Sequence, residues 1–110
     1  MDYLIVKTTN ELINADSSSE VFKKFLSGQW KLNPKRLDKV ESVVIVKDNI
    51  IINEFKLGAK VFYDREIKRC SVDLIDLQTP SKLVGLRISY GTANPATIKS
   101  EKDFKNLVVS

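Results

Sequence analysis

One short stretch of the chain places apolar and polar positions with the period of an α-helix. In DSSSEVFKKFLSG, residues 16–28, apolar side chains recur four positions apart and form one stripe, while two lysines take the other face. Ser17 and Glu20 have the spacing of a capping box, in which hydroxyl and carboxylate satisfy the first amides of a helix. The pattern predicts a helix of about ten residues.

Most of the remaining apolar positions follow the pattern of β-strands. YLIV, residues 3–6, predicts a short strand. SVVIV and IINEF lie on either side of Asp48 and Asn49, two residues that tolerate left-handed backbone, and so predict a tight hairpin. Both runs are almost continuously apolar near the turn. This indicates strands that are covered on both faces, or a closed barrel with a helix cap.

The second half of the chain predicts further short strands. KVFYDREIKRCSVDLIDL, residues 60–77, indicates two strands with a turn near Asp64 and Arg65, and LVGLRISYG indicates another with a bulge at Gly85. A polar tail then ends in a short helix or a strand. Five or six strands with one early helix predict an α+β, mostly β fold, a partly closed barrel with that helix covering it. Its 110 residues suit one domain, residues 1–110.

The composition excludes several kinds of chemistry. The chain has no histidine and a single cysteine, Cys70, so imidazole bases, zinc sites and internal disulfides cannot be built. Glycine-rich phosphate loops are absent as well. We therefore expect no metal and no cofactor. No apolar run could span a bilayer, the N-terminal residues lack a secretory signal, and the lone cysteine fits a reducing compartment, so we expect a cytoplasmic protein without membrane contact.

Positive charge is concentrated in one part of the chain. Residues 1–20 carry a net charge of −3, residues 21–48 carry seven basic and three acidic groups (+4), and the remainder adds +3, which gives the total of +4. The only tryptophan, Trp30, lies within the basic part, in SGQWKLNPKRLDK. Such a patch attracts polyanions at long range. The same lysines could equally form a solvated face that keeps a small protein soluble.

The order of these features resembles the PUA-like barrel superfamily, which includes ASCH, EVE and YTH domains. A helix is followed by GQWKLNPKR, the hairpin SVVIVKDNIIINEFKL, then LVGLRIS and ANPATI, over residues 22–98. The chain looks most like a small uncharacterised branch with a W-K-x-x-x-x-R element after the helix. It departs from the pattern in lacking a second tryptophan after the hairpin and an F-x-G element. Ile98 also stands where an aromatic residue is expected, and these departures speak against an aromatic cage of the YTH kind.

The resemblance implies a nucleic-acid-binding module, with RNA favoured over DNA, that holds a base or modified base between helix and barrel. By position, Trp30 would line the pocket, Lys31 and Arg36 would meet phosphate, and Asn94 would shape the opposite loop. Stacking and phosphate contacts are the physical basis of this function. The complete set of candidate residues is Trp30, Lys31, Lys35, Arg36, Lys24, Arg87, Tyr90 and Asn94.

Other interpretations remain open. Trp30 could plug the end of the barrel as part of the core, and Arg36 could form a surface ion pair. A second hypothesis is a protein-interaction or inhibitor module that binds no nucleic acid, such as a phage-encoded accessory factor, which pairs with its partner through exposed strand edges. A third is a ribonuclease without histidine, to which we give little weight because lysine, tyrosine or carboxylate groups would have to act as acid and base. Its residues would be Lys31, Arg36, Tyr63 and Asp64. We therefore expect that the protein is not an enzyme.

Overall fold

A computed structural model describes residues 2–9, 11–14, 16–26, 34–66, 68–89 and 96–109, and its structure is mostly β, as predicted. Neither of its two α-helices is long and apolar enough to cross a membrane. The elements in chain order are β1 (Asp2–Lys7), α1 (Ser19–Leu26), the 3-10 helix η1 (Pro34–Leu37), β2 (Val40–Lys47), β3 (Ile50–Asp64), β4 (Arg69–Asp76), β5 (Arg87–Ile88), β6 (Ala96–Ser100), α2 (Glu101–Leu107) and β7 (Val108–Val109).

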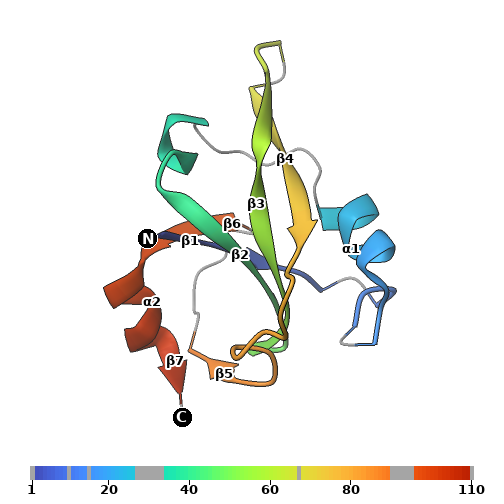
Figure 1. The fold of residues 1–110 in the computed structure, drawn as a ribbon, viewed down its shortest axis with the longest axis vertical. Coiled ribbons are helices and arrows are strands. Elements are labelled where there is room, and N and C mark those ends of the chain that lie inside the picture. The colour runs from blue at the N-terminus through green and yellow to red at the C-terminus, as the bar shows by residue number, and fades with distance from the viewer. Residues whose placement is uncertain are drawn as a thin grey trace.

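The strands form a single sheet that curls into an open half-barrel (Figure 1). Its order is β6-β1-β2-β3-β5-β7, and β4 pairs with β3. β1 and β2 are parallel and are connected through α1, whereas the other pairs are antiparallel. β3 is 15 residues long, so its first part pairs with β2 and its second part with β4. The tip of the β3–β4 hairpin extends beyond the rest of the sheet (Figure 1).

The hairpin between β2 and β3 confirms the prediction made from its turn residues. Lys47 faces Ile50 across the ladder, and the two residues between them, Asp48 and Asn49, have φ angles of 54° and 64°. Two successive left-handed residues give the turn a twist that matches the twist of the flanking strands. Further along β3, Ile52 is an extra residue opposite Ile45 and Val46, and it forms a bulge.

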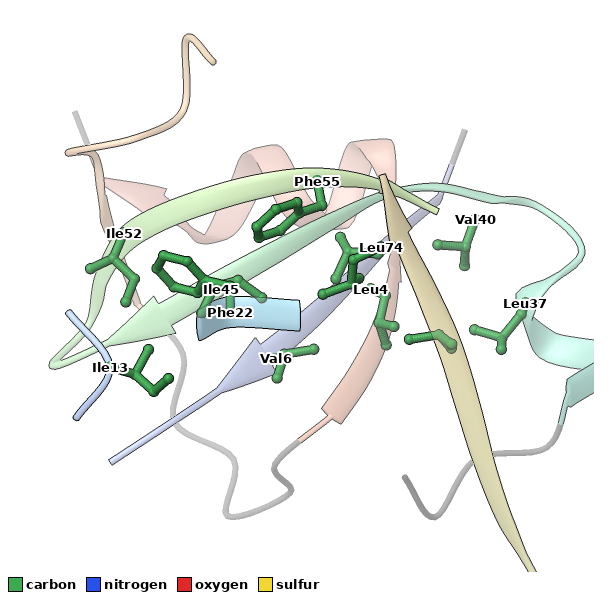
Figure 2. Packing of buried hydrophobic residues seen from close by; sticks show 12 residues of the cluster. Leu4, Val6, Ile13, Phe22, Leu37, Val40, Ile45, Ile52, Phe55 and Leu74 are labelled. Atoms are coloured by element: carbon green, nitrogen blue, oxygen red, sulfur yellow. The ribbon is translucent and has the colours of Figure 1, made fainter. Parts of the chain in front are cut away.

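Both faces of the central strands are buried, which explains their nearly continuous apolar runs. Along β1, Leu4 and Val6 point into one cluster of buried side chains, while Tyr3 and Ile5 point into another. We call these the α1-side core and the α2-side core. In the α1-side core, the ring of Phe22 from α1 lies beside that of Phe55 from β3, with centroids 5.7 Å apart (Figure 2). In the α2-side core, α2 contributes its buried Phe104.

The helix expected to cover the barrel is not evident. α1 has eight residues, a length of about 12 Å, and it lies at the side of the sheet next to β4 (Figure 1). It contributes Phe22 to the core from there. Its start also differs by one residue from the prediction, because Ser18 Oγ accepts a hydrogen bond from the Val21 amide, whereas Ser17 Oγ accepts one from Asn14.

Two other segments differ from the strands that their sequences predict. The segment after residue 60 is no separate strand, because β3 continues through it to the predicted turn at Asp64. In residues 83–89, only Arg87 and Ile88 are paired as a strand. Gly85 lies in the turn that precedes them, and its φ of 93° is a conformation that side chains with a Cβ rarely adopt.

Candidate functional site

Half of the candidate nucleic-acid-binding residues lie outside the residues that the structure describes, namely Trp30, Lys31, Tyr90 and Asn94. The other four are placed on three elements. Lys24 is exposed on α1, Lys35 is exposed on η1, and Arg87 is exposed on β5. Arg36 also belongs to η1, but its side chain is outside the described part of the structure.

The structure does not bring Lys35 and Arg87 together. Lys35 is on η1, which leads into the start of β2, whereas Arg87 pairs with Ile50, just after the turn that follows the end of β2. The eight residues of β2 separate these two places by roughly 25 Å. One small ligand cannot touch both side chains over that distance. A nucleic-acid strand several nucleotides long could do so.

A hollow beside η1 is lined by two described lysines of the basic segment, Lys35 and Lys39. Its volume is ≈ 380 Å³, and it lies between η1, the start of β1 and the end of β6. The amide of Asp2 donates a hydrogen bond to the carbonyl of Lys39 at 2.9 Å, which fixes β1 against the residues after η1. The lining residues are Asp2, Lys35, Asp38, Lys39, Ile98 and Ser100.

The charges in the η1 hollow balance. Lys35 and Lys39 contribute two positive groups, and Asp2 and Asp38 contribute two carboxylates. Lysine is a flexible point charge that can meet a phosphate without reading sequence. Because the carboxylates are as numerous, this hollow attracts polyanions only with the help of positive charge elsewhere on the chain.

A second hollow, of ≈ 400 Å³, lies at the outer edge of β3, and we call it the edge hollow. At this edge β3 passes from its pairing with β5 to its pairing with β4, and residues 77–86 loop out between the two partners. The amide of Glu54 falls in the gap and donates to the side-chain Oδ1 of Asn53 at 2.8 Å. The hollow is lined by Asn53, Glu54, Phe55, Asp76, Leu77, Thr79, Pro80, Ser81 and Val84.

The carboxylate of Glu54, in the edge hollow, accepts a hydrogen bond on each of its two oxygens. Its Oε2 accepts a hydrogen bond from Ser42 Oγ at 2.5 Å, and its Oε1 accepts one from Ser81 Oγ at 2.6 Å. Ser81 Oγ in turn accepts from the Leu83 amide at 3.1 Å. Two hydroxyl donors, one on each carboxylate oxygen, hold the side chain in one orientation. Sequence reasoning missed this arrangement because the two serines lie 12 positions before and 27 positions after Glu54.

Tyr3 lies on the same side of the sheet as Glu54. Burial raises the pKa of its phenol above the usual value of 10.0, and the nearby carboxylates of Glu101 and Glu54 raise the pKa further. The phenol therefore stays protonated over the whole neutral range. With a raised pKa and a buried ring, Tyr3 is suited to packing, and it is a poor acid at neutral pH.

Neither a metal site in the described residues nor a similar known protein points to a function. Among them, no group of three or more aspartate, glutamate or cysteine side chains is arranged to hold a metal ion. Comparison with protein families, with curated proteins and with solved structures finds no match to this chain. The two hollows and the distribution of charge are therefore the features that bear on function.

Proposed function

We propose that this chain is a cytoplasmic nucleic-acid-binding module, with RNA favoured over DNA, and that its half-barrel is a variant of the PUA-like fold. The observation that supports this proposal is the hollow beside η1. Lys35 and Lys39 line it, and both belong to the basic segment that carries Trp30. In the proposed complex, the lysines contact phosphates and Trp30 stacks on a base, which adds about 1–3 kcal/mol.

The proposed binding depends on electrostatics over more than one element. The η1 hollow is neutral by itself, but the chain as a whole carries +4. Lys35 and Arg87 lie roughly 25 Å apart, so we expect a bound strand to run over several nucleotides. Each phosphate contact releases condensed counterions, so the affinity must fall as the salt concentration rises.

The test is fluorescence anisotropy with labelled single-stranded RNA, single-stranded DNA and duplex DNA at several salt concentrations. We expect salt-sensitive binding, tightest for RNA. Lys35→Ala and Lys39→Ala should each flatten the plot of log affinity against log salt, by about 0.7 on single strands and about 0.9 on duplex DNA. Lys82→Ala is the matched control, because Lys82 is an exposed lysine in the loop of residues 77–86.

Trp30→Ala tests the stacking part of the proposal. A loss of about fivefold or more is expected, the equivalent of one stacked base. Circular dichroism must show that the variant is folded, since Trp30 would destabilise the fold on removal if it belonged to the core. A folded wild-type chain that binds none of the three nucleic acids at low salt rules out the proposed function.

A protein-interaction module is a second candidate, supported by exposed apolar side chains on the β3–β4 hairpin. Tyr63 is 42% exposed and Ile75 is 42% exposed. Among the described strands β4 pairs only with β3, so its other edge is available for a partner strand over part of its length. A stoichiometric protein partner that co-purifies after nuclease treatment, and is lost with Ile75→Lys, would favour this candidate.

A further inference from the structure

We propose that the edge hollow binds a small organic cation, a primary amine or guanidine carried on a short apolar stem. This inference does not rest on nucleic-acid binding, because the edge hollow and the η1 hollow share no lining residue. Its volume of ≈ 400 Å³ lies within the range of about 300–1,000 Å³ that small-molecule sites occupy.

The charge of the hollow selects the sign of the ligand. Both of its ionisable lining residues, Glu54 and Asp76, are acidic, although the chain as a whole is basic. Asp76 is already ion-paired within the chain, since its Oδ2 lies 3.2 Å from Lys23 Nζ. Glu54 forms no ion pair with any side chain in the described ranges.

The serine contacts of Glu54 orient its charge without neutralising it. Ser42 and Ser81 hold one carboxylate oxygen each, and a hydroxyl donor carries no positive charge to compensate a carboxylate. Glu54 is partly buried, so its negative charge is less screened than one on the open surface. An ammonium or guanidinium group beside it would supply the missing counter-charge through charge-assisted hydrogen bonds.

The apolar side chains that line the hollow favour a cation that carries an apolar stem. Leu77 and Val84 line the hollow with large apolar side chains that remain 36% and 44% exposed. Pro80 adds a third apolar surface. A stem of a few methylene groups would cover these side chains, and removing apolar surface from water is favourable. A fully hydrated inorganic cation would leave them exposed.

The alternative is a purely structural role, in which Glu54 only fastens residues 77–86 to the sheet. The Ser81 contact and the hydrogen bond from Leu83 serve that role. Both roles predict that loss of Glu54 disturbs the loop. They differ in that only a binding site gives saturable binding of a cation that depends on the charge of Glu54.

The experiment is an NMR titration of the full ¹⁵N-labelled chain with three unbranched probes that contain six carbons each. They are n-hexylamine, which is protonated at neutral pH, the neutral n-hexanol and the anionic hexanoate. We expect hexylamine to shift the amides of the lining residues in a saturable way. Hexanol should bind at least about tenfold more weakly because it lacks the charge, and hexanoate should not bind. Equal shifts with all three probes, or no saturable shift with hexylamine, overturn the proposal.

Two variants assign the binding to the charge in the hollow. Glu54→Gln should weaken hexylamine binding by about tenfold or more, whereas Glu41→Gln, which removes the same charge from an exposed position on β2, should not. If Glu54→Gln does not fold, Val84→Lys serves instead, since Val84 is exposed and its replacement places a competing cation at the rim. Unchanged hexylamine affinity in the folded variant overturns the proposal. Nucleic-acid binding should not weaken in any of these variants, because each of them raises the net charge by one unit.

Discussion

The rings of Tyr3 and Phe104 lie almost parallel, with centroids 4.1 Å apart and an angle of 14° between their planes. Tyr3 is on β1 and Phe104 is on α2, so this contact joins two elements from opposite ends of the described chain. Tyr3 is 8% exposed and Phe104 is 1% exposed. The stack is therefore the main attachment of α2 to the sheet, because Phe104 is the one buried residue of that helix.

Truncation of this attachment should cost much of the stability of the fold. Phe104→Ala should lower the free energy of unfolding by about 3–5 kcal/mol, the usual cost of deleting a buried aromatic ring. Urea denaturation followed by circular dichroism measures the change. Lys102→Ala, an exposed position on the same helix, should stay within about 0.5 kcal/mol of the wild type. Equal losses for the two variants would mean that the ring does not pack as described.

Tyr3 should make the fold sensitive to alkaline pH. Its pKa is raised in the folded state by burial and by Glu101 and Glu54, so the unfolded chain loses its phenolic proton first as the pH rises. The contribution is fully present below the usual pKa of 10.0 and is lost as the pH climbs through the folded value. The free energy of unfolding should therefore fall less steeply above pH 10 in Tyr3→Phe than in the wild type.

Denaturation curves collected at a series of alkaline pH values test this, together with the ultraviolet absorbance of tyrosinate. Tyr63→Phe is the control, because Tyr63 is 42% exposed. The same pH dependence in the wild type and in Tyr3→Phe would show that ionisation of Tyr3 is not linked to folding.

The turn between β2 and β3 should reject a β-branched residue. Asn49 has a φ of 64°, and valine in left-handed backbone costs about 1–2 kcal/mol. Asn49→Val should therefore be destabilised by that amount in thermal or urea denaturation. Asn49→Gly should be as stable as the wild type, because glycine adopts positive φ without a steric penalty. If valine is tolerated as well as glycine, the turn is not of the described type.

Glycine at position 58 should be required for the stability of the fold, because β4 approaches this position closely. A Cβ at this position would lie 2.9 Å from the Cβ of Asp73 on β4. Gly58→Ala should therefore lower the free energy of unfolding by about 1–3 kcal/mol. Adding Asp73→Gly removes the obstructing atom and should restore part of the loss in a double-mutant cycle. Asp73→Asn keeps that Cβ, so rescue by this substitution would contradict the steric explanation.

The features that could be predicted from the sequence are those whose signals are local. Asp48 and Asn49 determine the turn by their own backbone preferences, and the double-sided burial of β2 is visible in its continuous apolar run. The sequence of the polar tail predicts either a short helix or a strand, and the structure contains both, α2 and β7. β5 and β7 have two residues each, too few to show any alternation.

The features that could not be predicted depend on contacts between distant segments. The apolar stripe of α1 predicts that one face is buried, but it does not say where on the sheet the helix lies, and the expectation of a covering helix went beyond that pattern. The hydrogen bonds from Ser42 and Ser81 to Glu54 join β2, β3 and a loop. The loop has no periodic pattern from which such contacts could be predicted. Lys35 and Arg87 lie near opposite ends of β2, and their positions in the sequence do not show whether the fold brings them together.

The position of β1 between β2 and β6 has a consequence for how the chain folds. Tyr3 pairs with Ser42 on one side and with Lys99 on the other, so one edge of β1 is completed early and the other only after most of the chain is available. At a synthesis rate of about 5–20 residues per second, several seconds separate these two events. During this interval β1 presents an unpaired apolar edge that other nascent chains can join, and the speed with which β6 arrives decides between folding and aggregation.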